Sequence, residues 1–215
     1  MSTSKPPFSW PVVPAVASWA ADDLAVSPID AGLLSPVWQM LLLGDGSPTR
    51  QLALLTSSPT HVDLLDAISL GDDLCSAPKA VSLVAAPRVR RRVVLENARG
   101  ERLMHAVSWW NSDAYRRFLS DPGLPIGTSL VAARLEIFRQ MVDLHTGTAP
   151  AGLFFDGSPS GTVWARSYLM FNRGHAIALV HEVFSPILQR VVGPYRLLAD
   201  APLQEGAKQT EDRPL

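Results

Sequence analysis

The spacing of apolar residues near the start of the chain predicts two short helices in succession. Residues 36–41 place apolar side chains at helical spacing, and a Gly-Asp-Gly run at 44–46 ends the segment. Ser47 followed by Pro48 is typical of an N-cap with a proline in the first turn, and the pattern continues to Leu55. The sequence therefore predicts a helix, a tight turn and a second helix.

Extended segments farther along the chain predict an antiparallel sheet. Residues 60–70 begin with a β-branched residue and carry several apolar side chains, which favours a strand. Two further pairs of extended runs are each joined by a short connection that contains a glycine, which is typical of a hairpin. They are 91–95 with 102–109, and 162–171 with 176–184. An antiparallel sheet of about six strands with helices over one face is an α+β fold.

The stretch between the two hairpins predicts a short helix and a corner, and leaves one element open. Asn111 or Ser112 is a suitable N-cap for a helix that ends before Pro122. The Pro-Ile-Gly run at 125–127 predicts a rigid corner. The apolar residues of 130–142 fit either a helix or a strand plus a helix, because their periodicity does not separate the two.

Length and composition indicate one domain with loose ends. A chain of 215 residues suits a single sizeable core, which we expect within 29–202. Residues 1–28 are rich in Ser, Pro and Ala and predict a partly ordered arm, whereas the polar segment 203–215 predicts a frayed tail. Residues 146–161, with two prolines and four glycines, predict a long loop.

Charge and cysteine content exclude several classes of protein. A formal net charge of -1 gives no reason to expect a nucleic-acid partner. The single cysteine, Cys75, permits no internal disulfide and no thiolate metal site, and the five histidines show no metal-ligand spacing. Because no apolar run suits a signal peptide or a membrane span, we expect a cytoplasmic protein without stable membrane insertion.

Glu182 is the most informative single residue, because an apolar run precedes it and Val183 and Phe184 follow it. A carboxyl group in such a segment is expected to be buried, and a buried carboxylate must be paired, hydrogen-bonded or protonated. A desolvated glutamate is suited to proton transfer near neutral pH. The alternative is a solvent-facing residue on the outer face of an edge strand.

The arginines at 88, 90, 91 and 92 are a second candidate for chemistry. Strand alternation places Arg90 and Arg92 on one face and Arg91 on the other, so at least one guanidinium is expected to point inward. An inward arginine needs an anion, and a substrate carboxylate suits its planar fork. The alternative is a solvated charge run.

These residues belong to a set of short motifs that resembles the chorismate lyases, in particular a branch known as a cyanobacterial and chloroplast reading-frame family. The motifs follow the family's order and span about residues 37–188. Each is weak alone, but the ordered set is fairly specific. They are Asp45-Gly46-Ser47-Pro48-Thr49-Arg50, Arg91-Arg92-Val93-Val94-Leu95, Ser108-Trp109-Trp110-Asn111, Pro125-Ile126-Gly127, Arg134-x-Glu136-x-x-Arg139, Arg166-Ser167-Tyr168 and His181-Glu182-Val183-Phe184-Ser185-Pro186.

The resemblance implies a sheet with a substrate cavity closed under helix-turn-helix flaps. It also implies elimination of pyruvate from chorismate to leave 4-hydroxybenzoate, without a metal or organic cofactor. Chorismate is a dianion whose ring becomes aromatic in the reaction. Positioning, charge neutralisation and one proton-transfer group therefore suffice. Chorismate is the expected partner, and a monomer is favoured over an oligomer.

Specific roles follow from the same resemblance. Glu182 meets the substrate hydroxyl, and Arg91 binds the ring carboxylate, with Arg92 as the neighbouring alternative. Ile126, next to the corner glycine Gly127, offers backbone contacts. The other expected substrate-binding residues are Ser47 and Thr49 in a flap, and Arg134, Arg139 or Arg166 as partners of the enolpyruvyl carboxylate.

Three other functions remain open from sequence. The first is a small-molecule-binding module of the kind attached to transcriptional regulators, which shares this sheet architecture, since fold does not imply function. The second is a chorismate-using enzyme that makes a different aromatic acid. The third is an interaction protein, which would be favoured only if Glu182 and Arg91 were exposed on opposite faces.

Overall fold

The computed structural model describes residues 15–20, 34–74, 77–154 and 161–194. Of the expected N-terminal arm, 15–20 falls within this part of the chain. The expected C-terminal tail, 203–215, and Cys75 lie outside the described residues.

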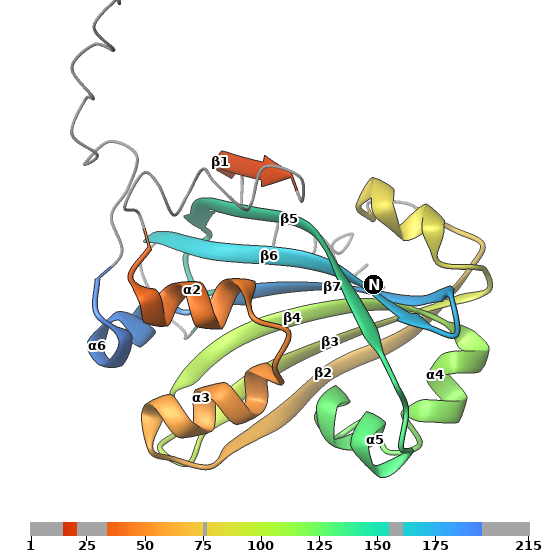
Figure 1. The fold of residues 1–215 in the computed structure, drawn as a ribbon, viewed down its shortest axis with the longest axis horizontal. Helices are drawn as coiled ribbons and strands as arrows, with labels where there is room; N and C mark the ends of the chain where they lie inside the picture. Colours follow the sequence, from red (N-terminus) through yellow and green to blue (C-terminus); the bar gives the residue numbers. More distant parts are fainter. Residues whose placement is uncertain (1–14, 21–33, 75–76, 155–160, 195–215) are drawn as a thin grey trace, which may run out of the picture.

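A curved antiparallel sheet forms the body of the described chain (Figure 1). Its seven strands lie in the order β1-β5-β6-β7-β4-β3-β2. The α+β prediction is confirmed, with one strand more than the expected six or so because the arm contributes β1. The strands are β1 (Ala15–Ala20), β2 (Thr60–Gly71), β3 (Arg88–Asn97), β4 (Arg102–Asn111), β5 (Phe138–Ala149), β6 (Gly161–Asn172) and β7 (His175–Phe184).

Both expected hairpins are present, and their turns show why the sequence forms them. Gly100 in the β3–β4 turn has a φ of 75°, which favours glycine. The Asn97 side chain accepts hydrogen bonds from the backbone N–H groups of Arg99 and Glu101, each at 3.0 Å. In the β6–β7 turn, Arg173 and Gly174 both have positive φ. These turns fix the register of the strands that carry the candidate residues.

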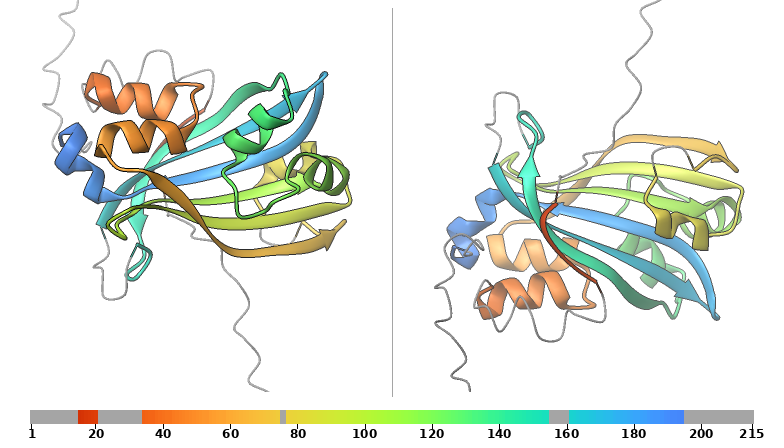
Figure 2. Two further views of the ribbon diagram at one scale, coloured as in Figure 1. Left: turned by 90° about the horizontal axis from the view of Figure 1, so that it is seen from below. Right: turned by 90° about the horizontal axis from the view of Figure 1, so that it is seen from above.

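Helices cover one face of the sheet near the predicted flap (Figure 2). The expected helix pair is α2 (Pro36–Leu43) and α3 (Pro48–Thr56), with α6 (Gln189–Val192) beside α3. Apolar residues of α2 and α3 pack on the inner face of the sheet, where Trp38, Leu42 and Leu52 are buried against Leu95 and Phe184. The shorter helices are α4 (Ser112–Phe118), α5 (Ile126–Ala132) and the 3-10 turns η2 (Lys79–Leu83) and η3 (Pro186–Leu188).

The opposite, outer face is covered by η2 and by the chain that follows β5. Val81 of η2 is buried against Val107, Trp109 and Leu179. Phe154 packs on the same face, with Val163 and Val183 among its neighbours. The outer face is therefore a packed apolar layer.

The segment that sequence left open is a helix followed by a strand. Helix α5 ends at Ala132, and β5 begins at Phe138. Between them Arg134 has a φ of 51°, a left-handed conformation that redirects the chain. The expected corner at 125–127 is the start of α5, and the expected loop at 146–161 begins only after β5 ends at Ala149. No helix of the described chain is long and apolar enough to cross a membrane.

Candidate functional site

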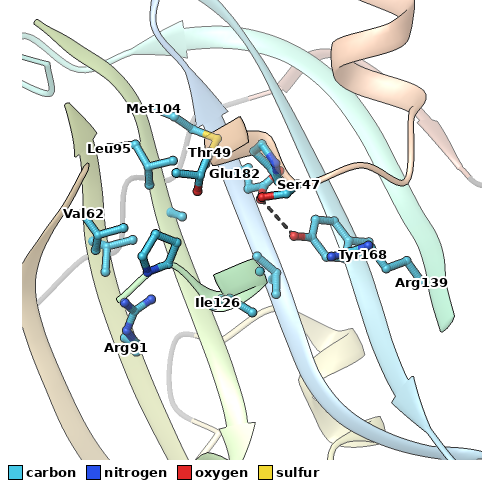
Figure 3. Close-up of a pocket in the computed structure, with 16 residues that line it drawn as sticks. Ser47, Thr49, Val62, Arg91, Leu95, Met104, Ile126, Arg139, Tyr168 and Glu182 are labelled. Atoms are coloured by element: carbon cyan, nitrogen blue, oxygen red, sulfur yellow. Dashed lines mark hydrogen bonds between the residues drawn. The ribbon is translucent and has the colours of Figure 1, made fainter. Parts of the chain in front are cut away.

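A pocket with about 450 Å³ of empty space, its open mouth included, lies on the inner face of the sheet (Figure 3). Its floor comes from β3, β4, β6 and β7, and the first residues of α3 and α5 cover it. The polar side chains that line it are Ser47, Thr49, Arg91, Arg139, Tyr168 and Glu182. Its apolar walls include Val62, Val93, Leu95, Met104 and Val180. A pocket with apolar walls and a few convergent polar groups suits a small organic ligand.

Glu182 is buried in the centre of the sheet, with 2% of its surface exposed. Its strand, β7, pairs with β4 on one side and β6 on the other, so Glu182 does not lie on an edge strand. Arg166 is its cross-strand partner on β6 and donates from Nε to Oε2 at 2.7 Å. Tyr168 donates its hydroxyl hydrogen to Oε1 at 2.9 Å. Each carboxylate oxygen therefore has a fixed donor, which leaves further lone pairs to accept from a ligand.

The electrostatics of this group keep its members in the states that hydrogen bonding requires. Burial, followed by the Glu182 carboxylate, raises the pKa of Tyr168, so its hydroxyl stays protonated and donates. Burial alone would lower the pKa of Arg166, but the attraction of the Glu182 carboxylate opposes it, and the pKa is raised. The pair is therefore a buried ion pair with good geometry.

Arg91 is a buried cation at the pocket wall, with 1% of its surface exposed. Its Nε and Nη2 donate to the carbonyl oxygen of Pro122 at 3.1 and 2.7 Å, and Nη2 also donates to that of Leu124 at 2.9 Å. It forms no ion pair with any described residue, and its Nη1 makes no hydrogen bond to the part of the chain described. Burial lowers its pKa, opposed by Tyr115 and Asp121. A buried guanidinium without a carboxylate partner is a ready binding group for an anion.

Arg92 lies on the other face of β3, as strand alternation requires. Its guanidinium binds the Asp66 carboxylate of β2, with Nε at 2.8 Å from Oδ2, and Arg90 lies 3.8 Å from the other oxygen. Of the two neighbouring arginines, Arg91 lines the pocket and Arg92 does not.

The three candidate partners of a second carboxylate occupy different places. Arg139 lines the pocket, with its Nη1 2.5 Å from the carbonyl oxygen of Asp45 and its guanidinium 5.9 Å from the centre of the Tyr168 ring. Arg166 donates hydrogen bonds to Glu182 and to backbone carbonyl groups of residues 41, 42 and 44. Arg134 follows α5 and lines a separate surface hollow with Phe138 and other residues. Of the three, Arg139 is the one that the fold brings to the pocket.

The two covers of the pocket touch each other. Ser47 precedes α3, and Gly127 lies in the first turn of α5. A Cβ atom at position 127 would lie 2.8 Å from the Ser47 Oγ and 3.2 Å from its Cβ. Glycine is required for this close approach. Ile126 and Thr49 line the pocket beside this contact, so all four expected cover residues surround its mouth.

The sequence predicted no role for Tyr168, although the residue lies in the Arg166-Ser167-Tyr168 motif. The available signal was its spacing from Arg166, since residues two apart on a strand share a face. No group of three or more His, Cys, Asp and Glu residues among those described could hold a metal ion.

Solved structures show what the fold resembles. The PhnF protein from Mycobacterium smegmatis superimposes with a TM-score of 0.51 at 14% identity, over 67% of this chain and 66% of PhnF. The structure of the PhnF effector domain alone gives the same TM-score and identity, over 68% of this chain and 92% of that domain. At this identity the likeness concerns the fold alone.

Sequence comparisons identify nearer relatives. The protein named "Uncharacterized protein ycf21" of Pyropia yezoensis is 31% identical over 155 residues, which is 71% of this chain and 83% of the relative. The protein of that name in Porphyra purpurea is 29% identical over 160 residues, or 74% and 86% of the two chains. A family model described as "Chorismate pyruvate-lyase Rv2949c-like" matches residues 42–192, which include every residue that lines the pocket. The chain thus belongs to the Rv2949c-like chorismate pyruvate-lyase family.

Proposed function

We propose that this protein eliminates pyruvate from chorismate and leaves 4-hydroxybenzoate. The observation that carries the proposal is the buried Arg91 guanidinium, which faces an apolar pocket without an anionic partner among the described residues. Family membership supports the same reaction class. A negatively charged ligand would neutralise this cation where water is largely excluded, so the interaction would be strong.

The pocket offers a distinct group for each polar part of chorismate. Arg91 and Arg139 lie on opposite sides of the pocket with Glu182 between them (Figure 3). In our proposal Arg91 binds the ring carboxylate through Nη1, and Arg139 faces the enolpyruvyl carboxylate. Glu182 accepts a hydrogen bond from the ring hydroxyl. The apolar walls then enclose the ring.

The reaction needs no electron transfer, and its atoms balance within the substrate. The ether bond between the ring and the enolpyruvyl group breaks, and the ring carbon that bears the hydroxyl loses its hydrogen. The ring becomes aromatic, and the released enolate takes up one proton at its methylene carbon to become pyruvate. Two guanidinium groups hold the dianion, and the Glu182 carboxylate orients the hydroxyl and is the basic group nearest the ring.

The direct test is to incubate the purified protein with chorismate and measure both products. We expect pyruvate and an aromatic acid in equal amounts, with the mass and retention of 4-hydroxybenzoate. No release above the uncatalysed background would refute the enzymatic proposal. Saturable binding of chorismate without turnover would instead favour a ligand-binding module, and a different aromatic acid would correct the product.

A further inference from the structure

Two arginines bind the end of α2 and the turn that leads to the pocket cover. Arg166 Nη1 donates to the carbonyl oxygens of Leu41, Leu42 and Gly44 at 3.1, 2.9 and 3.1 Å. Arg139 Nη1 donates to the next carbonyl group, that of Asp45. The last carbonyl groups of a helix lack partners within the helix and form the negative end of its dipole. A cation at this place therefore stabilises both the helix end and the turn.

The same Arg166 guanidinium also holds the Glu182 carboxylate. Its Nε donates to Oε2 of Glu182, while its Nη1 faces the turn, and the side chain is only 2% exposed. Three residues after Gly44 the chain reaches Ser47, which begins the cover over the pocket. One buried side chain thus connects the carboxylate on the pocket floor with the segment above it.

Displacement of the turn would disturb this arrangement. If the turn moved away to admit a ligand, Arg166 would lose up to three acceptors in a buried place, where an unsatisfied cation is costly. The guanidinium would then have to rotate toward other acceptors, and Oε2 of Glu182 would lose a donor of fixed direction. Tyr168 donates only to the other oxygen and forms no hydrogen bond to the turn among the described residues.

We propose that Arg166 is a positioning residue that couples closure of the α2–α3 turn to the orientation of the Glu182 carboxylate. The inference rests on the proposed function insofar as Glu182 acts on the substrate hydroxyl. It adds that the carboxylate is oriented for reaction only while the turn is closed over the pocket.

Amide hydrogen exchange of residues 44–52 in the ligand-free protein tests the connection without any assay of turnover. Arg166→Gln should accelerate exchange in this segment by at least about tenfold, because charge-assisted hydrogen bonds to the turn are lost. Glu182→Gln should accelerate it severalfold, because a neutral amide oxygen holds the guanidinium more weakly than the carboxylate does. Tyr168→Phe is the matched control, and its exchange should stay within about twofold of the wild-type rate.

Steady-state kinetics then test the consequence for the reaction. Arg166 does not line the pocket, so Arg166→Lys should lower kcat by about tenfold or more and change KM less. Arg166→Gln should lower kcat further, which makes the lysine variant a partial rescue. If Arg166 had a purely structural role, kcat would not fall stepwise from the wild type through Arg166→Lys to Arg166→Gln while KM changed less.

The outcomes separate the two proposals. Unchanged exchange of residues 44–52 in folded Arg166→Gln, or in Glu182→Gln, would overturn the coupling even if chorismate is turned over. Absence of turnover in the wild-type protein would refute the proposed function, while the exchange rates would still decide whether the connection exists. Should Arg166→Gln fail to fold, the same comparison of Arg166→Lys with Tyr168→Phe decides it.

Discussion

Strands β6 and β7 carry a buried polar cluster on each face, and the two clusters differ in what they adjoin. On the inner face Arg166 and Tyr168 both donate to Glu182, and Tyr168 and Glu182 line the pocket. On the outer face Ser167 and His181, the sequence neighbours of Arg166 and Glu182, form a second group with residues of β5. The comparison shows that burial of polar groups does not by itself identify a site. The inner cluster is the candidate because its carboxylate lines a cavity.

The members of the outer cluster form hydrogen bonds with one another. His181 Nδ1 lies 3.0 Å from the Ser167 Oγ, which donates to Asp143 at 3.2 Å, and His145 Nδ1 lies 2.9 Å from the same carboxylate oxygen. The two imidazole rings stack with centroids 5.5 Å apart. None of these residues lines the pocket. We therefore expect substitutions on this face to affect stability and those on the inner face to affect turnover.

The largest effect is expected at Glu182. Glu182→Gln removes the carboxylate acceptor for the substrate hydroxyl and should lower kcat for pyruvate release by about 10²–10⁴-fold. The matched control is Ser167→Ala on the outer face of the adjacent strand, which should keep turnover within about twofold while costing roughly 1 kcal/mol of stability. Equal losses of turnover in the two variants would remove the distinction between the faces.

The next effect concerns the neighbouring arginines of β3, which point to opposite faces. Arg91→Gln removes the proposed carboxylate partner and should raise KM for chorismate by about 10–100-fold. Arg92→Gln breaks the pair with Asp66 on the outer face and should leave KM nearly unchanged. Initial-rate measurements over a range of chorismate concentrations check both, and a larger KM change at Arg92 would reverse the assignment.

A smaller effect is expected at the contact between the pocket covers. Gly127→Ala places a methyl group 2.8 Å from the position of the Ser47 Oγ, so one cover must shift. We expect kcat/KM to fall by about tenfold with little change in thermal stability, since Gly127 is not among the residues with positive φ. Ser47→Ala combined with Gly127→Ala relieves part of the crowding and should restore part of the activity. If Gly127→Ala alone retains full activity, the covers have room to move.

The smallest effect is a pH dependence of stability that arises on the outer face. Burial lowers the pKa of His181 to about 3 and that of His105 to about 4. The unfolded chain takes up protons near pH 6.5 while the folded protein keeps both rings neutral, so stability is complete above that pH and lost as pH falls toward 4. From pH 6.5 to 5.5 the free energy of unfolding should decrease by about 1 kcal/mol per histidine.

Urea unfolding at several pH values measures this dependence. His105 packs edge-on against Phe154 with ring centroids 5.7 Å apart. His105→Gln should make the decrease in stability smaller, because a glutamine side chain takes up no proton in the unfolded chain. A free energy of unfolding that stays constant between pH 7 and 5 would contradict the assignment of these two groups.

The elements with strong local signals could be predicted from sequence. The helix pair and both hairpins follow from spacing and turn residues, and the burial of Glu182 follows from its apolar neighbours. Strand β5 could not be predicted because its apolar residues also fit a helix, and its register shifts between Met141 and Asp143. Strand β1 could not be predicted either, because among the described strands it pairs only with β5, which was itself not predicted as a strand.

The candidate site was predictable only as far as local pattern extends. Alternation shows that Arg91 and Arg92 face opposite sides, but only the assembled sheet shows which side holds the pocket. Similarly, the choice among Arg134, Arg139 and Arg166 depends on contacts between segments distant in sequence. The bond from Arg166 to Leu41 spans 125 positions and leaves no local signal.

Strand β1 covers the edge of β5, whose backbone N–H and C=O groups would otherwise be unpaired. It pairs with residues 143–147 of β5, and Trp19 stacks on Trp164 with centroids 5.6 Å apart. A chain shortened to begin at residue 34 would leave the N–H and C=O groups of β5 open to pairing with another molecule. Such a protein would be prone to self-association, and β1 therefore protects against aggregation.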